Sequence, residues 1–240
     1  MPSIRRRSIF TTRLVNSAGR GQQPLVIDDM RRAILAGDEP PGTLIPIDAV
    51  ATFFGVSPIP VREALKVLCG EGLVEHTPHV GYSVAMLTFE EFRELYDVRQ
   101  ALEASALREA VLRATAGDDA SVREHHARMG EAIALGDERG HHAASRRFHM
   151  ALIAPAGMPR LVHMYESAWN ITEPARPMAR VPRDGRVLFH DDHGAMLAAF
   201  IDRDGDRLVS AASRHYDHLR GAFDEFRDDP ELFRQTSPRA

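Results

Sequence analysis

The sequence predicts a mainly α-helical protein of two domains, an N-terminal winged helix-turn-helix over residues 24–86 and a C-terminal all-α helical bundle over residues 88–228. Three observations lead to this prediction. Apolar residues recur at helical spacing through most of the 240 residues. A short helix with a basic outward side is followed by a hairpin that contains a glycine. After Thr88 the strand signals stop, and only long helical patterns remain.

Three helices and a hairpin make up the first predicted domain. An amphipathic helix runs from near Pro24 to Gly37, and a second short helix ends at Gly55. A third helix follows Ser57 after a tight turn. The stretch "GLVEHTPHVGYSVAML" then has the pattern of two short strands around a turn. This order of elements is that of a winged helix-turn-helix, which places its third helix in the major groove of DNA.

The start of the third helix is set by the stretch "GVSPIPVREAL". Ser57 is a good N-cap residue, which makes Pro58 the first helical residue and Pro60 the third. Proline suits the first turn, because backbone N–H groups there have no acceptor within the helix. Since Pro60 has no N–H, we expect the Ser57 hydroxyl to accept a hydrogen bond from the backbone of Ile59.

The two faces of this third helix differ in character. Val61, Leu65 and Leu68 recur at i, i+4 and i+7 and form an apolar stripe, whereas Arg62 and Lys66 point away from it. Outward residues near the start of such a helix meet base edges or phosphates. The residues that we expect to face DNA are Ser57, Ile59, Arg62 and Lys66 on the helix, with His79 and Gly81 at the tip of the hairpin.

The second predicted domain contains six helices. Thr88 and Glu91 form a capping-box pattern at its start, and Gly117 with the two aspartates after it is taken as the first break. The expected helices cover approximately residues 88–115, 120–135, 137–153, 159–172, 186–203 and 206–226. A proline-rich loop joins the fourth and fifth helices, and residues 229–240 are expected to be a tail.

Composition excludes several classes of protein. The net charge of −4 argues against a generic binder of polyanions. Cys69 is the single cysteine, so the chain has no internal disulfide. No apolar run approaches the length of a membrane span, and residues 1–23 read as a disordered basic arm rather than a signal peptide. Arg5–Arg7 in this arm are either solvated or near phosphates. We expect a soluble cytoplasmic protein with no membrane partner.

Histidines are numerous, with twelve in the chain. Taken singly, each is expected to be a surface residue. Three histidines facing inward from three helices would be different, because converging neutral imidazoles suit Zn²⁺, Ni²⁺ or related ions. Those in the second half of the chain are His125, His126, His141, His142, His149, His163, His190, His193, His215 and His218.

The first domain resembles the winged helix of GntR-family bacterial transcription regulators over about residues 25–86. The matching residues are Pro41-Gly42, Ala51, Gly55-Val56-Ser57, Pro60-Val61-Arg62-Glu63-Ala64-Leu65, Leu68, Glu71-Gly72-Leu73-Val74 and Gly81. The resemblance implies DNA binding and makes Arg62 the best candidate for a DNA contact. Two departures stand out. The family usually has arginine at the position of Pro58 and often a basic residue at the position of Val80, which implies weaker or altered operator recognition.

The second domain resembles the helical FCD effector domain of the FadR-type branch. Its matching segments are "ELYDVRQALEASALREA", the Phe148-His149 pair, the "DDH" that ends at His193 and "RDGDRLVSAASRH", which ends at His215. Many such domains bind a divalent metal through three histidines and an aspartate. The resemblance assigns the histidine positions to His149, His193 and His215, but Ser145 stands at the aspartate position. A three-histidine site with weaker or altered metal binding and a metal-free ligand pocket both remain open.

The resemblance also suggests how an effector is held. Arg99 matches an arginine of the first FCD helix, and its planar guanidinium suits a carboxylate. The alternative is an ion pair within the helix, because Glu103 lies four residues further on. Ser145 is expected to border the same effector pocket. A small organic acid is therefore the expected effector class.

The favoured function is a transcription regulator whose operator binding responds to a small-molecule effector. A symmetric homodimer would place two winged helices on a palindromic operator. Two alternatives remain. A metal-dependent enzyme would use the histidines, with Asp191 or Asp192 as a base, but would leave the winged helix unexplained. An architectural DNA-binding protein would use its second domain for dimerisation alone.

Overall fold

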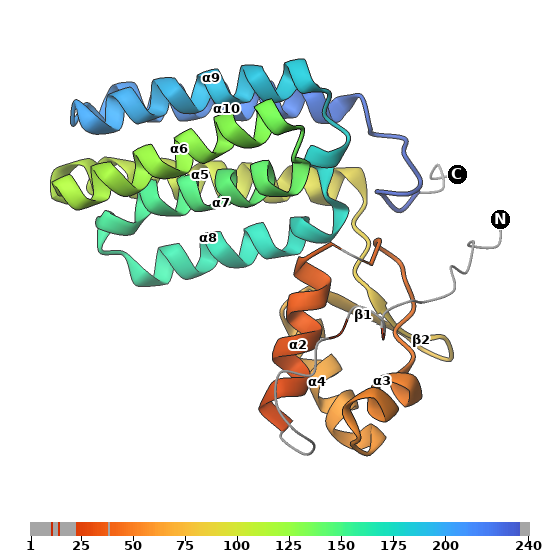
Figure 1. The fold of residues 1–240 in the computed structure, drawn as a ribbon. Helices are drawn as coiled ribbons and strands as arrows, with labels where there is room; N and C mark the ends of the chain where they lie inside the picture. Colours follow the sequence, from red (N-terminus) through yellow and green to blue (C-terminus); the bar gives the residue numbers. More distant parts are fainter. Residues whose placement is uncertain (1–10, 12–13, 15–22, 38, 236–240) are drawn as a thin grey trace. The chain divides into compact units, whose positions relative to one another are not determined.

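The protein is described by a computed structural model that covers residues 11, 14, 23–37 and 39–235. It is mostly helical, with one small sheet (Figure 1). The chain divides into two compact units. The first contains residues 1–92, 170–176 and 228–240, and the second contains residues 93–169 and 177–227. The chain therefore passes from one unit to the other after residues 92, 169, 176 and 227.

The first unit contains the predicted winged helix-turn-helix. Its elements are α2 (Gln23–Leu35), α3 (Ile47–Phe54), α4 (Pro58–Gly70), β1 (Val74–Thr77) and β2 (Gly81–Val84). The two strands pair antiparallel, from Val74 opposite Val84 to Thr77 opposite Gly81. A single bridge between Leu44 and Ser83 adds a short third edge. All five elements lie close to where the apolar periodicity and the turn residues predict them.

The core of the winged helix is formed by the apolar stripes of its helices and strands. The largest buried side chains include Met30, Ile34, Leu65 and Leu68. Leu14 is also buried there, at 6% exposure, although residues 1–23 were predicted to be a disordered arm. Most of that arm, including Arg5–Arg7, lies outside the described residues.

An ion pair reinforces this core at its edge. The guanidinium of Arg31 on α2 donates to both carboxylate oxygens of Glu71, which follows α4, at 2.9 and 2.6 Å. The hydrogen bonds that Arg31 donates to Glu71 hold the pKa of Arg31 above its ordinary value. A two-point contact of this kind fixes the orientation of both partners. It therefore helps to hold α4 in a defined position against α2.

Two later segments complete the first unit. Residues 229–240 were expected to be a tail, but Leu232 and Phe233 are buried, and the Phe233 ring meets the edges of Phe89 and Phe92. Ile171 lies beside Gly72, which has a φ of 75° and has room for no larger residue without displacing that isoleucine. These contacts join residues that are far apart in the sequence, so local patterns do not reveal them.

The second unit is built from six helices. They are α5 (Phe89–Arg113), whose first turn belongs to the other unit, α6 (Ala116–Leu135), α7 (Glu138–Ile153), α8 (Pro159–Thr172), α9 (Arg183–Ile201) and α10 (Gly205–Asp224). In this bundle α6 packs against α7 and α9, and α10 packs along α9 (Figure 1). Within the described residues, no helix is both long enough and apolar enough to cross a membrane.

Most helix ends follow the predicted capping residues. Thr88 and Glu91 make both hydrogen bonds of the expected capping box, at 2.8 and 3.1 Å. The predicted break at Gly117 is wrong, because Thr115 caps α6 and Asp118 completes a second capping box. Gly117 therefore lies in the first turn of a helix, where capping by its neighbours outweighs the low helix propensity of glycine.

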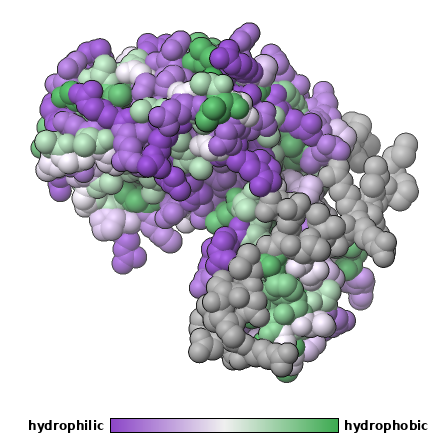
Figure 2. Space-filling view, viewed as in Figure 1, coloured by the Kyte–Doolittle hydropathy of each residue, from purple (hydrophilic) through white to green (hydrophobic). Residues whose placement is uncertain are grey.

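The predicted proline-rich loop contains short 3₁₀ turns, η2 (Glu173–Ala175) and η3 (Pro177–Ala179), and another, η1 (Ala154–Ala156), precedes α8. The apolar side chains of the bundle are buried in one continuous core, which includes Phe148, Leu152, Tyr165 and Phe200. The face of the second unit that is visible in Figure 2 is mostly hydrophilic, with isolated hydrophobic residues.

Candidate functional site

A tight turn sets the start of α4. Gly55 ends α3 with a left-handed φ of 66°, and the N–H of Val56 donates to the carbonyl of Ala51 at 3.0 Å. This conformation suits glycine, since a side chain there would be strained. The chain then extends through Ser57 and enters α4 at Pro58. The position of the two prolines in the first turn is therefore as predicted.

The predicted division of α4 into two faces is confirmed. Val61, Ala64, Leu65 and Leu68 are buried in the core of the winged helix. The residues on the opposite side are exposed. They are Ser57, Ile59, Arg62, Glu63, Lys66 and Val67. The outward face thus combines polar, charged and apolar side chains on one short helix.

The two cations on this face differ in their partners. Lys66 donates to Glu63 at 2.8 Å, and this hydrogen bond raises the pKa of Lys66. Arg62 makes no hydrogen bond or ion pair with the described part of the chain. The charge of Lys66 is therefore partly neutralised, whereas the guanidinium of Arg62 is available to an external partner.

The Ser57 cap is a correction to the sequence prediction. Ser57 has the extended backbone of an N-cap residue, but its side chain makes no capping hydrogen bond. A capping hydroxyl needs a free N–H at the second or third helical position. Pro60 removes the third, and the side chain of Ser57 does not turn toward the N–H of Ile59. The hydroxyl therefore lies exposed beside the first turn of α4.

The hairpin between β1 and β2 ends in a tight turn. The N–H of Val80 donates to the carbonyl of Thr77 at 3.1 Å. His79 has a φ of 65° and Gly81 a φ of 117°. In the turn from Thr77 to Val80, proline at the second position and a positive φ at the third are the pattern of a type II turn. His79 occupies the third position, which glycine or asparagine adopts more easily than histidine. His79 and Val80 are exposed at the tip.

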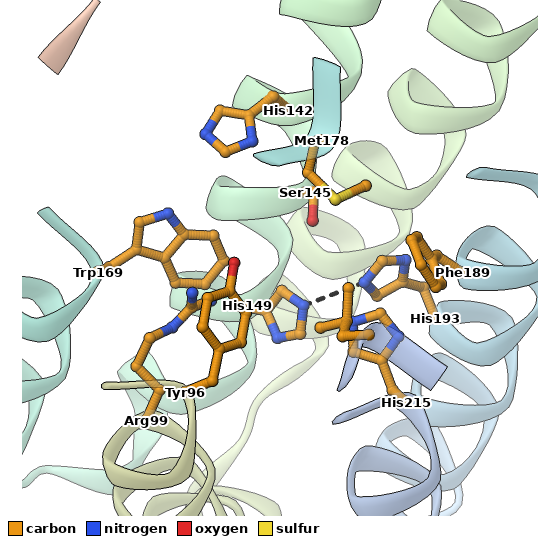
Figure 3. A pocket seen from close by; sticks show the side chains of 11 residues that line it. Tyr96, Arg99, His142, Ser145, His149, Trp169, Met178, Phe189, His193 and His215 are labelled. Carbon is orange, nitrogen blue, oxygen red and sulfur yellow. Dashed lines mark hydrogen bonds between the residues drawn. The ribbon is translucent and has the colours of Figure 1, made fainter. Parts of the chain in front are cut away.

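In the second unit, three histidines converge inside the bundle. His149 on α7, His193 on α9 and His215 on α10 are each at most 2% exposed. One nitrogen of each ring lies within 4.8 Å of the others. Figure 3 shows the three rings turned toward one another. The histidines that the family resemblance selected therefore meet at one place.

The spacing and protonation of these rings suit a metal ion. Nε2 of His149 lies 3.0 Å from Nε2 of His193. Two nitrogen lone pairs at this distance repel unless a proton or a cation lies between them. Burial holds the pKa of His193 well below its ordinary value and lowers that of His215 to about 4. Neutral imidazoles are the form that binds metals, and tetrahedral ligands of zinc lie about 3.3 Å apart.

A buried glutamate orients the first of these histidines. Glu103 on α5 is fully buried, and its Oε1 accepts hydrogen bonds from Nδ1 of His149 at 2.6 Å and from the Tyr165 hydroxyl at 3.2 Å. Because a carboxylate can only accept, Nδ1 of His149 carries the proton and Nε2 faces the other rings. Burial opposes the charge of Glu103, but His149 holds the pKa of Glu103 below its ordinary value.

Asp192 has a similar place beside the third histidine. It is 5% exposed and accepts a hydrogen bond from Nδ1 of His218 at 2.7 Å, while Nδ1 of His215 lies 3.5 Å away. Burial opposes the charge of Asp192, but His215 and His218 hold its pKa below the ordinary value. In the enzyme hypothesis Asp191 or Asp192 was a catalytic base. A carboxylate held in this way is suited to orienting a histidine.

Arg99 is buried next to the histidines instead of pairing along its own helix. It is 3% exposed, and its guanidinium carbon lies 3.5 Å from the ring centroid of Trp169 and 4.5 Å from that of Tyr96. The described residues contain no Arg99–Glu103 ion pair, so the intrahelical alternative is wrong. Burial opposes the charge, but nearby phenols and Glu103 raise the pKa of Arg99.

These groups surround one cavity. Arg99, Ser145 and the three histidines line it, together with Trp169 and Met178. Ser145 lies one turn before His149 on α7, and Figure 3 shows its hydroxyl pointing toward the rings. The cavity has a volume of about 20 Å³, which is room for an ion or one water. Nε of Arg99 and Nδ1 of His193 have no hydrogen-bond partner among the described residues.

The sequence pattern did not indicate that Glu103 or Asp192 lies beside a histidine of the cavity. Glu103 was considered only as a partner for Arg99, because the i, i+4 spacing is the relation that a sequence displays. Asp192 was considered only as a base. Two features of the sequence could have drawn attention to these carboxylates. Asp192 directly precedes His193, and Glu103 lies in the same expected helix as Arg99. Neither signal indicates which histidine each carboxylate meets.

Comparison with known families agrees with this architecture. Residues 24–84 match the family described as bacterial regulatory proteins, gntR family. Residues 94–218, more than half of the chain, match the FCD domain. The first match covers the winged helix, and the second covers the bundle that contains the histidines. The two matches together account for both units.

Individual relatives are transcription regulators as well. The chain is 28% identical over 195 residues to the Nta operon transcriptional regulator of Aminobacter aminovorans, covering 77% of this chain and 90% of that protein. It is 26% identical over 196 residues to the HTH-type regulator BphR of Paraburkholderia xenovorans, covering 78% of each.

A solved structure supports the fold. E. coli McbR/YncC superposes with a TM-score of 0.74 at 22% identity, covering 85% of this chain and 98% of that one. The families and relatives are those of regulators and not of enzymes, and an FCD domain is an effector-binding domain. The chain belongs to the GntR family of bacterial transcription regulators, as a member with an FCD effector domain.

Proposed function

We propose that the outward face of α4 carries the operator-reading residues of this regulator and that Arg62 is the principal one. The observation that supports this proposal is a difference between the two cations on that face. Lys66 forms an ion pair with Glu63, whereas Arg62 has no such partner among the described residues. An unpaired guanidinium near the start of the helix can bind a phosphate or the two acceptors of guanine without first breaking a contact. Ser57, Ile59 and Lys66 border the same surface.

The hairpin tip is the second part of the proposed DNA surface. His79 and Gly81 lie at an exposed turn that can approach a neighbouring groove, and Val80 stands between them. Pro58 and Val80 occupy positions where the family often has basic residues. The affinity of this regulator for phosphates is therefore expected to depend more on Arg62 than it does in relatives that have those extra charges.

A homodimer is the form in which we expect the protein to bind its operator. One winged helix contacts only a few base pairs, and a two-fold symmetric pair doubles that number on a palindromic site. Effector binding would then act by favouring one arrangement of the two winged helices. A protein that bound DNA without responding to any effector would instead support the architectural alternative.

The histidine cavity is proposed to hold a divalent metal and, once its lining side chains move apart, a small carboxylate effector, because the space in this structure is enough for only one ion or water. His149, His193 and His215 would hold Zn²⁺ or Ni²⁺, and the bound ion would supply a positive charge for an anionic oxygen. Glu103 orients the His149 ring through a hydrogen bond, and Asp192 lies 3.5 Å from Nδ1 of His215. Arg99 has an unpaired Nε beside the same cavity, where it would bind the carboxylate of the effector.

Ser145 limits how tightly a metal is expected to bind. It occupies the position from which an aspartate would supply a fourth, charged ligand, and a neutral hydroxyl is a poor replacement. The position is therefore left to water or to an oxygen of the effector. A cation held by three neutral histidines retains its full charge, which favours an anionic effector over a neutral one.

The DNA part of the proposal is tested by fluorescence anisotropy of the whole protein. The probe is the duplex upstream of its own gene, titrated across a salt series and compared with a scrambled duplex. Tight, sequence-selective and salt-sensitive binding is expected. Equal binding of both duplexes at every salt concentration would contradict operator recognition at that site.

The effector part is tested by calorimetric titration. Metal-stripped protein is titrated with Zn²⁺ or Ni²⁺ alone, and one ion per chain is expected. Thermal unfolding of the metal-loaded protein is then followed with small mono- and dicarboxylates. At least one is expected to raise the melting temperature of the wild-type protein but not of Arg99→Lys, which keeps the charge and loses the planar donor pair. Equal responses would contradict the role of Arg99.

A further inference from the structure

Ile59 is an exposed apolar residue that takes no part in the core of the first unit. It is 67% exposed on the outward face of α4, one turn before Arg62. The buried face of the same helix consists of other residues, and the core of the first unit does not include Ile59. An exposed isoleucine loses contact with water only when a partner covers it. Its contribution is therefore to be sought in binding.

The neighbours of Ile59 make the first turn of α4 poor in hydrogen-bond donors. Pro58 and Pro60 have no backbone N–H. The side chain of Ile59 neither donates nor accepts. Arg62 lies beyond this turn and is the first side chain of the helix that can form two hydrogen bonds with a base. Apart from the exposed Ser57 hydroxyl and the backbone N–H of Ile59, the tip of the helix thus offers a base edge an apolar surface.

The major groove displays one apolar feature, the C5-methyl group of thymine. We propose that Ile59 reads the methyl group of one thymine in each operator half-site. This inference rests on the proposed placement of α4 in the major groove. The branched side chain of isoleucine is stiff at χ1, so little freedom is lost when it packs against a methyl group.

The inference separates the roles of two neighbouring positions. Arg62 supplies charge and hydrogen bonds, whereas Ile59 supplies discrimination between thymine and the other bases. Arginine, the usual family residue at the position of Pro58, can hydrogen-bond guanine; the apolar first turn of this chain cannot. The preferred half-site is therefore expected to contain a T·A pair at the position that faces the start of α4.

The test removes single methyl groups from DNA. Operator duplexes are first selected from a random pool by the whole protein, and each thymine of the selected duplex is then replaced by deoxyuridine, which pairs normally but lacks the methyl group. One position per half-site is expected to lose about fourfold in affinity, the effect of one methyl-sized group. Anisotropy titrations measure the loss.

Protein variants complete a double-mutant cycle. Ile59→Ala removes the contact from both half-sites at once, so it should bind the selected duplex about 16-fold more weakly than the wild type and show no further loss with deoxyuridine at that position. Val67→Ala is the matched control, because Val67 is also exposed on α4 but lies at its other end. This variant should remain sensitive to deoxyuridine. Thermal unfolding of both variants should match that of the wild type.

The outcomes distinguish this inference from the proposed function. If selection enriches no sequence, operator reading by α4 fails and the inference fails with it. If a sequence is enriched but every thymine tolerates replacement, the inference alone is overturned. The inference is also overturned if deoxyuridine lowers the affinity of Ile59→Ala as much as that of the wild type, because another group then contacts the methyl group. The inference is supported if Ile59→Ala is insensitive to deoxyuridine while the wild type and Val67→Ala remain sensitive.

Discussion

The outward face of α4 and the histidine cavity place functional side chains in opposite environments. On α4, Arg62 and Ile59 are exposed and lie one turn apart on the same helix. In the cavity, His149, His193 and His215 are buried and come from three helices. A buried polar group must find partners inside the protein or lower its stability. Changes in the cavity are therefore expected to affect both ligand binding and folding, whereas changes on α4 should affect DNA binding alone.

Both regions depart from the family pattern at one position. Pro58 replaces an arginine on α4, and Ser145 replaces an aspartate in the cavity. Each departure removes a charge from a site of proposed binding. The neighbouring residues determine the consequence, since α4 retains the unpaired Arg62 while the cavity retains three buried histidine rings. The following predictions test whether the two regions behave as differently as their environments suggest.

The largest effect is expected from removing a proposed metal ligand. His193→Ala takes one nitrogen from the three that converge, and two histidines alone bind divalent ions weakly. Bound Zn²⁺, measured by elemental analysis after dialysis, should fall to background. His163→Ala is the control, because His163 is exposed on α8. An unchanged amount of metal in His193→Ala would remove this residue from the site.

Arg62→Ala should weaken binding to the selected operator about 10- to 100-fold and leave thermal unfolding unchanged. Lys66→Ala should have a smaller effect, because the Lys66 charge is already shared with Glu63 at 2.8 Å. Anisotropy on the selected duplex measures both variants. Equal losses for the two would show that unpaired charge does not distinguish these residues.

Glu103→Gln tests whether a buried carboxylate supports the metal site from behind. Glutamine can accept the Nδ1–H of His149 but has no charge to make the ring a stronger ligand. Metal affinity should fall about tenfold, the range seen when such supporting residues are changed. Glu109→Gln, on the surface of the same helix, serves as the control in calorimetric titrations. An affinity equal to the wild type would limit Glu103 to a structural role.

Ser145→Asp should move the cavity toward the four-ligand pattern of the family. A carboxylate one turn before His149 can reach the same ion, and its charge should raise Zn²⁺ affinity several-fold. Calorimetric titration is again the measurement, with Ser145→Asn as a neutral variant of the same shape. If both variants bind as the wild type does, Ser145 does not face the ion.

The smallest effect concerns pH and a histidine beside the cavity. Burial lowers the pKa of His141 to about 4, and Arg186 acts in the same direction. Because the folded-state pKa lies below the unfolded value of about 6.5, the neutral ring contributes its full stability above pH 6.5. That stability is lost progressively as the pH falls toward 4.

Between pH 7 and pH 5.5, the loss from His141 should be on the order of 1 kcal/mol. His141→Leu should remove this share of the pH dependence, which urea unfolding at each pH measures. His163→Leu is the control at an exposed position. A pH dependence that is the same in His141→Leu and in the wild type would mean that another group titrates there.

Much of the fold could be predicted because its signals are local. The capping box at Thr88, the glycine that ends α3 and the prolines that open α4 act through residues within a few positions of each other. The missed boundary at Gly117 was also local, since Thr115 and Asp118 form a capping box. The burial of Phe233 was not local, because its ring partners Phe89 and Phe92 lie more than a hundred residues away.

The candidate sites divide in the same way. The outward side of α4 follows from helical spacing, so the sequence by itself determined which residues there face solvent. It also placed His149 and Ser145 on one side of a helix. Helical spacing, however, only relates residues within one helix. The sequence therefore assigned Glu103 to Arg99, its neighbour four residues away.

Only the tertiary structure decided the partners of the buried charges. Glu103 meets His149, Arg99 stacks on Trp169, and Asp192 lies beside His215. A buried charge takes the partner that best replaces water, and that choice depends on which helices pack together. An exposed polar side chain needs no partner from another helix, because water can form its hydrogen bonds. The sequence thus determined the surface that we propose reads DNA, and packing determined the cavity that we propose holds the effector.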